Sequence, residues 1–376
     1  MADTCVTDRC RVRFAALRPG SRPARRRQDW SAGSDSLLEV RTRDTDWEGV
    51  RLHVVTGKGG TGKTTVAGAL AIALAAGGRR VLLMEVEGRQ GIARLFDSPP
   101  LPYTERRVAV APATATLPGG EVDGLAADPE AALVEYLEMF YNLRHAGTAL
   151  TRLGVVDFVT TIAPGLRDVL LSGKAVEATR RRRGGRLRYD AVVMDAPPTG
   201  RIGKFLNVAT EVSGLAKVGP IRGHADTVQS VIKSPQTAVH FVTVLEEMPV
   251  QETLDGIAEL RGLAQGGLQL GGIMINMVQP EELADDQLHA AAAGQLDEHD
   301  LDLGLKAAGV EDRRGLAHSL ATELAEHARE ALAQRAQRAR LSGVDQPRYE
   351  LPLITGPMDL AGLYRLAAAL REQGAA

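Results

Sequence analysis

The stretch Gly57-Lys58-Gly59-Gly60-Thr61-Gly62-Lys63-Thr64-Thr65 decides the fold of this chain. It follows an apolar run, Leu52–Thr56, and precedes an Ala/Leu-rich run that stops at Gly77-Gly78. The stretch fits the pattern G-x-x-x-x-G-K-[ST] at every fixed position. A strand, a glycine-rich loop and a helix in this order indicate a loop that wraps the phosphates of a nucleotide.

The chemistry of the loop explains its residue types. Glycines permit unusual backbone angles and leave room for backbone N–H groups to surround phosphate oxygens. Lys63 is predicted to contact the β- and γ-phosphates, and the Thr64 hydroxyl is predicted to bind Mg²⁺. The predicted nucleotide-binding residues of the loop are Gly57, Gly59, Gly60, Thr61, Gly62, Lys63, Thr64 and Thr65.

Composition excludes several other classes of protein. The chain has 376 residues, a formal net charge of −2 and two cysteines, Cys5 and Cys10. A disulfide scaffold and a four-cysteine metal site within one chain are therefore excluded. No apolar run reaches the roughly 20 residues of a membrane span, and no secretory signal is evident. We expect a cytoplasmic protein, and the balanced charge gives no reason to expect nucleic-acid binding.

The first 48 residues differ from the rest. Eight Arg and no acidic residue lie between Arg9 and Arg27, together with Pro19, Gly20 and Pro23. We expect residues 1–48 to be disordered or to be a non-native N-terminal extension from an upstream start codon. A basic arm that binds nucleic acid is the alternative. Order is expected to begin at Val50.

From Val50 onward, apolar runs alternate with helical stretches, which indicates an α/β fold built on a mostly parallel sheet flanked by helices. Two long helical insertions are expected, near residues 129–181 and 281–342, within one ATPase domain of residues 50–371. The basic run Arg180–Arg183 is expected to be a solvated loop. The predicted strands are Leu52–Thr56, Val81–Val86, Val122–Ala126, Tyr189–Asp195, Ala238–Leu245, Gly272–Met277 and Tyr349–Ile354.

Acidic residues close two of these strands. Asp195 ends the strand before Ala196-Pro197-Pro198-Thr199-Gly200, and a carboxylate there can hold a water of Mg²⁺. Glu85 and Glu87 end the second strand and point the same way. Either is a candidate base for the attacking water, and surface carboxylates at a strand end are the alternative reading.

Lys58 gives the loop a second lysine that an ordinary phosphate loop does not need. The run from Lys58 to Thr64 resembles the deviant Walker A motif of the family that contains MinD, ParA, the nitrogenase iron protein and the arsenite pump ATPase ArsA. The resemblance implies a dimer in which Lys58 reaches the partner subunit's nucleotide, as an arginine finger does. A solvated loop lysine is the alternative.

Further residues resemble the ArsA branch of that family. Asp195 and the residues after it resemble its Asp-Thr-Ala-Pro-Thr-Gly-His switch, with Arg201 in the place of the His. Counting back from Phe96 aligns Glu87 with the Asp of a second switch, which implies that Glu87 positions and deprotonates water. The resemblance also implies that Asn276 and Pro352 contact adenine. No guanine-binding Asn-Lys-x-Asp motif is present, which favours ATP over GTP.

The resemblance, which covers most of residues 50–369, implies an ATP hydrolase with Mg²⁺ that couples nucleotide state to a client. The predicted assembly is a homodimer or a heterodimer with a paralogous ATPase, and the client is a membrane protein or a transporter. Residues 50–376 contain no Cys, so the thiolates that hold arsenite in ArsA are absent. A client groove could use Tyr136–Leu143 and Val155–Leu171, although core packing is the alternative. The alternative functions are a ParA- or MinD-like positioning ATPase and a metabolic P-loop ligase or kinase.

Overall fold

A computed structural model describes most of the chain. The chain divides into a larger unit, within residues 41–278 and 340–376, and a smaller one that includes residues 279–339. The described residues are 45–113, 118–141, 164–207, 220–263, 267–281, 283–310 and 315–376.

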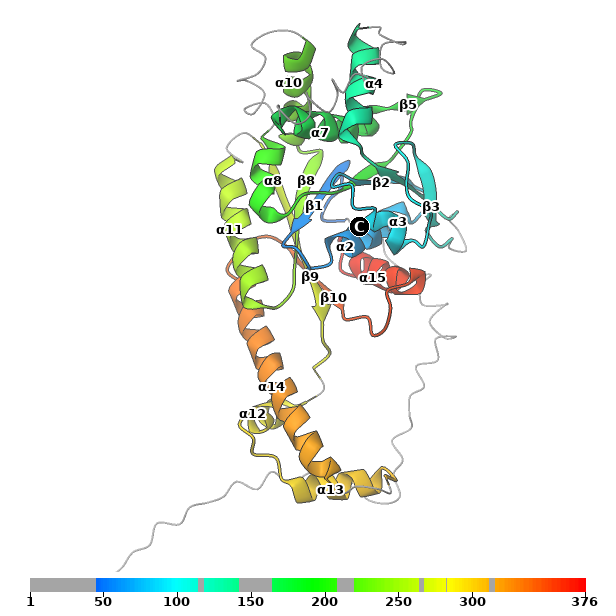
Figure 1. Ribbon diagram of the computed structural model, residues 1–376. Helices are drawn as coiled ribbons and strands as arrows, with labels where there is room; N and C mark the ends of the chain where they lie inside the picture. The colour runs from blue at the N-terminus through cyan, green and yellow to red at the C-terminus, as the bar shows by residue number, and fades with distance from the viewer. Residues whose placement is uncertain are drawn as a thin grey trace, which may run out of the picture. The chain divides into compact units, whose positions relative to one another are not determined.

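The larger unit is built on an eight-stranded sheet (Figure 1). Seven strands are parallel to their neighbours, and only β3 at one edge is antiparallel, which confirms the predicted mostly parallel α/β fold. In spatial order the strands are β10 (Arg348–Pro352), β9 (Gln269–Val278), β8 (Thr237–Thr243), β1 (Leu52–Gly57), β7 (Ala191–Asp195), β2 (Arg80–Glu85), β4 (Glu121–Ala126) and β3 (Arg106–Val110).

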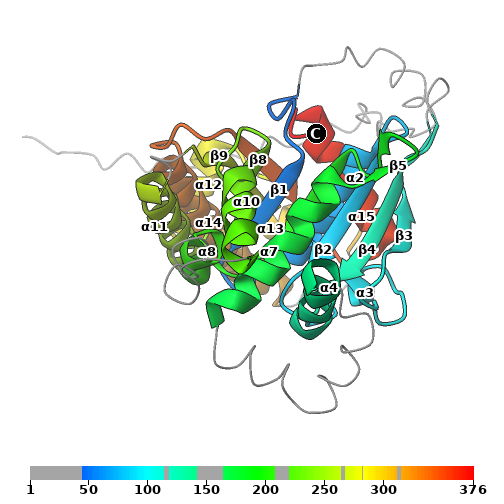
Figure 2. The same ribbon diagram turned by 90° about the horizontal axis from the view of Figure 1, so that it is seen from above.

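The central strands are buried on both faces because helices cover the sheet on both sides (Figure 2). On β1, Val54 belongs to one apolar cluster and Val55 to the other, as the alternation of a strand requires. The helices α2 (Lys63–Ala75) and α15 (Leu360–Glu372) pack on the Val55 side. The helices on the Val54 side are α7 (Pro164–Arg180), α8 (Thr199–Leu206), α10 (Pro220–Ile232) and α11 (Glu247–Leu263).

Three short elements were not expected from the sequence. β3 starts with the exposed Arg106 and Arg107, so it lacks the apolar run that marks the buried strands. The basic run after α7 forms a hairpin of β5 (Arg182–Arg183) and β6 (Arg186–Leu187) rather than a plain loop. Both of its strands are exposed, and positive φ angles at Gly184 and Gly185 make the turn between them.

The packed chain also begins earlier than the sequence suggested. The ring of Trp47 is 7% exposed and meets the ring of His240 edge-on at 5.0 Å between centroids. The Tyr349 hydroxyl donates to the Asp46 carboxylate at 2.6 Å. Residues 45–48 therefore belong to the folded unit, and a chain that begins at Val50 would lose these contacts. Residues 1–44 lie outside the described residues.

Residues 279–339 form a helical unit of their own. It contains α12 (Asp285–Ala292), α13 (Glu298–Ala307) and most of α14 (Leu316–Leu341). A small apolar cluster of Leu288, Ala291 and Ala328 joins α12 to α14. Arg335 on α14 pairs with Glu281 at 2.8 Å and also with Asp285. These contacts give the unit a core of its own with an exposed ionic network beside it.

Two buried histidines lie side by side on two neighbouring strands in the middle of the sheet. His53 on β1 and His240 on β8 are almost fully buried, and Nδ1 of His53 lies 3.1 Å from Nε2 of His240. The Gly272 N–H donates to Nδ1 of His240 at 3.1 Å. Neutral His240 therefore carries its proton on Nε2 and donates it to His53. Burial lowers the pKa of His53 to about 4, and burial together with His53 holds the pKa of His240 well below its ordinary value.

This pair predicts a loss of stability in mild acid. Between pH 6.5 and about 4 the unfolded chain protonates both histidines while the folded chain does not, so the free energy of unfolding should fall as the pH falls. Two protons correspond to at most about 2.7 kcal/mol per pH unit. Urea unfolding between pH 7 and 4.5 measures this slope.

The control for this prediction is the double variant His53→Gln, His240→Gln. Asp195 has a raised pKa and contributes with the opposite sign, since its folded form binds a proton more readily. The difference between wild type and the double variant removes that contribution. Equal slopes in the two proteins would show that the histidine pair does not set acid stability.

Candidate functional site

The phosphate loop joins β1 to α2 in a tightly packed turn. Gly57 has a φ of 156°, and a Cβ on it would lie 2.2 Å from the Val242 carbonyl oxygen. Gly62 has a φ of 83°, and a Cβ there would lie 2.4 Å from Nδ2 of Asn276. Both glycines are therefore required by close neighbours as well as by backbone angle.

Hydrogen bonds hold the loop in shape. The Thr61 hydroxyl donates to the Lys58 carbonyl at 2.9 Å, and Nδ2 of Asn276 donates to the Thr61 carbonyl at 3.0 Å. Asn276 is 4% exposed, so the structure places it against the phosphate loop at the end of β9. Pro352 pairs with Val278 on the neighbouring strand. Contact of Asn276 and Pro352 with adenine remains a prediction.

Thr64 and Asp195 come together as the sequence predicted for a magnesium site. The Thr64 hydroxyl donates to the Asp195 carboxylate at 2.6 Å. Burial raises the pKa of Asp195 to about 6, and the carboxylates of Glu85 and Glu87 add to that rise, whereas Thr64 and Lys63 oppose it. A hydroxyl and a buried carboxylate are oxygen ligands that Mg²⁺ accepts, directly or through its waters. The residues present therefore fit the metal.

The two carboxylates after β2 have different surroundings. Glu85 is 2% exposed, and its Oε2 accepts a hydrogen bond from the Ile92 N–H at 3.1 Å. The Glu87 side chain is 17% exposed and lies between two guanidinium groups, 3.8 Å from Arg89 and 3.9 Å from Arg201. Glu87 also lines a cavity of about 210 Å³. Glu87 therefore opens onto a space that water can fill, whereas Glu85 is almost fully buried.

The segment after Asp195 is tied to β1 beside the phosphate loop. The Ala196 N–H donates to the Val55 carbonyl at 2.9 Å, and the Thr56 hydroxyl donates to the Pro197 carbonyl at 2.7 Å. Four residues after Pro197, Arg201 reaches Glu87. The two segments that resemble switches therefore meet at the Glu87–Arg201 pair, at the edge of the 210 Å³ cavity.

Lys58 pairs within its own chain. Its Nζ lies 2.9 Å from Oε1 of Glu252 on α11, and both side chains are partly exposed. No local signal links two residues so far apart in the sequence, and only the fold brings α11 to the loop.

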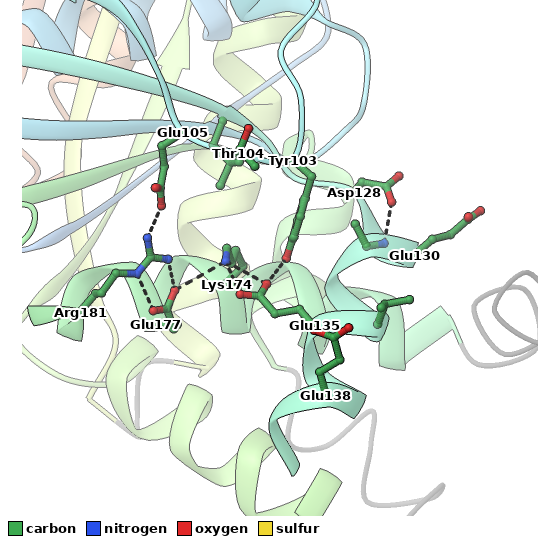
Figure 3. Close-up of a pocket in the computed structure, with 13 residues that line it drawn as sticks. Tyr103, Thr104, Glu105, Asp128, Glu130, Glu135, Glu138, Lys174, Glu177 and Arg181 are labelled. Atoms are coloured by element: carbon green, nitrogen blue, oxygen red, sulfur yellow. Dashed lines mark hydrogen bonds and ion pairs between the residues drawn. The ribbon is translucent and has the colours of Figure 1, made fainter. Parts of the chain in front are cut away.

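A second cavity, of about 680 Å³, lies away from the phosphate loop, between α4 (Pro129–Tyr141), α7 and the segment before β3 (Figure 3). Lys174 pairs with Glu135 at 2.7 Å and lies 5.2 Å from the centre of the Tyr103 ring. Burial alone would raise the pKa of Glu135, but hydrogen bonds from Lys174 and Tyr103 lower it. Arg181 is also paired, with Glu177 and Glu105. We interpret this network as a structural link between α4 and α7.

The segments considered for a client groove are only partly described. Residues 142–163 lie outside the described residues, and so do the side chains of Met139 and Phe140. In the described parts, Tyr136, Leu166 and Leu170 are buried in one apolar cluster with Leu133. These side chains pack inside the protein. Within the described chain, no helix is both long and apolar enough to cross a bilayer.

Comparison with known proteins shows the family of the chain. Residues 50–234 match the family model for anion-transporting ATPases. The chain is 51% identical over 327 residues to ATPase BagA of Mycobacterium tuberculosis, covering 87% of this chain and 94% of that protein. It is 27% identical over 262 residues to an arsenical pump-driving ATPase of Escherichia coli, covering 63% of this chain and 41% of that protein. The chain belongs to the anion-transporting, ArsA-like ATPase family and is an ATP hydrolase.

Proposed function

We propose that the protein hydrolyses Mg-ATP as a dimer and couples its nucleotide state to a client protein. The observation that carries the proposal is the hydrogen bond from Thr64 to Asp195 at the carboxyl end of β7, beside the phosphate loop, with Glu87 just after the neighbouring strand β2. Ligands of open α/β sheets bind at this edge. The roles of the individual residues below are part of the proposal.

The phosphate loop would bind the triphosphate through its backbone. The N-terminus of α2 points its unpaired N–H groups and the positive end of its dipole toward the loop. Lys63, the first residue of α2, would neutralise charge on the β- and γ-phosphates. Thr64 and Asp195 would hold Mg²⁺, which neutralises charge between the β- and γ-phosphates when it is bound.

Glu87 would act as the general base. Its carboxylate lies at the edge of a cavity large enough for several waters and within 4 Å of Arg89 and Arg201. The two guanidinium groups on either side of this carboxylate would limit its rotation. A carboxylate so placed can accept the proton of the water that attacks the γ-phosphate.

Dimerisation would be required to complete the site. Lys58 lies on the loop but forms an ion pair with Glu252. In a single chain, Lys58 would therefore not contact the phosphates of the nucleotide bound by that chain. In a dimer, Lys58 would leave Glu252 and reach the nucleotide bound by the partner. The state of the nucleotide would then control the dimer interface, which is how hydrolysis could drive a client.

The client is proposed to differ from arsenite. The E. coli relative is named as an arsenical pump-driving ATPase, but this chain has no Cys beyond Cys10. A pump or another membrane-protein partner remains the proposed class of client. Capture of partners by a Glu87→Ala variant held in ATP would identify it.

Dimer-dependent catalysis predicts a rate that depends on protein concentration. Hydrolysis per chain should rise with concentration and reach a plateau as dimers form. Lys58→Ala should bind ATP as wild type does but should lose that rise, ending about tenfold or more below wild type on the plateau. A concentration series of ATPase rates, with sedimentation in ATP and in ADP, measures both properties.

Glu252→Gln provides the matched comparison. Exposed ion pairs contribute roughly 0.2–1 kcal/mol, so removing this one should lower the half-maximal protein concentration about 1.4- to 5-fold. A paralogous subunit added to Lys58→Ala should restore activity if the natural assembly is a heterodimer. A wild-type monomer whose activity is independent of concentration would contradict the dimer mechanism.

A further inference from the structure

Glu85 is a buried carboxylate, and one of its two oxygens accepts no hydrogen bond from the residues that the structure describes. Its Oε2 accepts the Ile92 N–H, but its Oε1 is buried and meets no hydrogen-bond partner among the residues that the structure describes. The residue is 2% exposed, so bulk water does not solvate that oxygen. An unpaired, buried acidic oxygen is costly and calls for a cation or an ordered water.

The position of Glu85 places it beside Thr64 and Asp195. In the sheet, Glu85 on β2 lies directly opposite Asp195 on β7. A Cβ built on Gly91 would be 3.4 Å from the Thr64 hydroxyl oxygen and 3.7 Å from Oε2 of Glu85. The Thr64 hydroxyl and the two carboxylates therefore surround one small region at the start of α2.

We propose that Glu85 supplies a second carboxylate to the magnesium site, next to Asp195, with its Oε1 facing the metal or one of its waters. This inference rests on the proposed function, because the metal enters with ATP. It assigns to Glu85 a role different from that of base, for which Glu87 is the better placed residue.

Electrostatics supports a cation at this place. Glu85 and Asp195 are both buried and lie directly opposite each other on neighbouring strands, so two carboxylates share this region and a cation between them would offset their repulsion. Mg²⁺ favours oxygen ligands, keeps several waters and combines one or two carboxylates with substrate phosphates. The described residues contain no cluster of three or more acidic, His or Cys side chains able to hold a metal alone. The proposed Mg²⁺ site has only two carboxylates, and the phosphates of the nucleotide would supply its remaining ligands.

Glu85 also connects the metal site to the base. Its Oε2 holds the Ile92 N–H in the first turn of α3 (Gly91–Leu95), and the loop that leads to this turn carries Glu87. A cation bound to one oxygen of Glu85 would hold the whole carboxylate in place. The other oxygen of that carboxylate accepts the Ile92 N–H, so the end of the loop that carries Glu87 would be held as well. Metal binding and the position of Glu87 become coupled through a single side chain.

The test uses Glu85→Gln, which keeps an acceptor for the Ile92 N–H and removes the charge. The measurement is Mn²⁺ binding, by electron paramagnetic resonance, to the full chain with a non-hydrolysable ATP analogue. We expect Glu85→Gln to bind Mn²⁺ about 10-fold more weakly or worse. Its nucleotide affinity in EDTA should equal that of wild type. Its melting temperature in EDTA should equal or exceed the wild-type value, because a buried charge without a partner has been removed.

Two further variants make the outcome decisive. Glu87→Gln, the matched control at the neighbouring carboxylate, should bind Mn²⁺ as wild type does. Glu85→Asp, which keeps the charge but withdraws it by one methylene, should have an affinity between wild type and Glu85→Gln. Wild-type Mn²⁺ affinity in both Glu85 variants would overturn the inference. If instead wild type itself showed no metal-dependent nucleotide binding, the proposed function would fail, and the two failures are thereby distinguished.

Discussion

Lys63→Ala should lower ATP hydrolysis by about 10³-fold or more, because it removes the positive charge that the loop places next to the transferred phosphoryl group. Lys63 is the first residue of α2 and also acts on the charge of the buried Asp195. Its loss should weaken nucleotide binding as well. Phosphate release at saturating ATP, together with titration of a fluorescent ATP analogue, measures both effects.

The control for Lys63→Ala is a lysine outside the site. Lys306→Ala changes an exposed residue at the end of α13 in the helical unit and should leave hydrolysis unchanged. Both variants should melt near the wild-type temperature without nucleotide. If Lys63→Ala hydrolysed ATP at the wild-type rate, the phosphate loop would not be the catalytic site.

The sequence predicted seven of the eight strands of the sheet, including the edge strand β10, but not the edge strand β3. β1, β7 and β8 are buried over their whole length, so they appear in the sequence as mainly apolar runs without a regular alternation of polar and apolar residues. β3 is half exposed and begins with two arginines, so its pairing with β4 depends on tertiary contacts. The inclusion of Trp47 in the core follows from its contact with His240, which is far away in the sequence.

The same distinction between local and distant signals applies to the site. The phosphate loop is contiguous, so its glycines, Lys63 and Thr64 were predicted together with the turn that they form. The Lys58–Glu252 pair and the Glu87–Arg201 pair join separate elements. The unpaired oxygen of Glu85 depends on burial by several segments, which a linear pattern does not encode.

Glu87→Gln should bind ATP and Mg²⁺ as wild type does but should hydrolyse ATP about 10²- to 10⁴-fold more slowly, because the amide cannot accept the proton of the attacking water. The nearby arginines remain and can still contact the amide oxygen, so the loop should keep its position. Single-turnover hydrolysis with enzyme in excess separates this chemical step from product release.

Excess Mg²⁺ distinguishes the base from the metal ligand. Glu85→Gln should also be slow at low Mg²⁺, since it binds the metal weakly, but rising Mg²⁺ should restore much of its rate. No concentration of Mg²⁺ should restore Glu87→Gln, because its defect lies in proton transfer. The opposite pattern, with Glu87→Gln rescued and Glu85→Gln slow at every Mg²⁺ concentration, would exchange the two assignments. Burial favours Glu87 as the base and Glu85 as the metal ligand, because a base must contact water. The Glu87 side chain is 17% exposed, whereas Glu85 is 2% exposed.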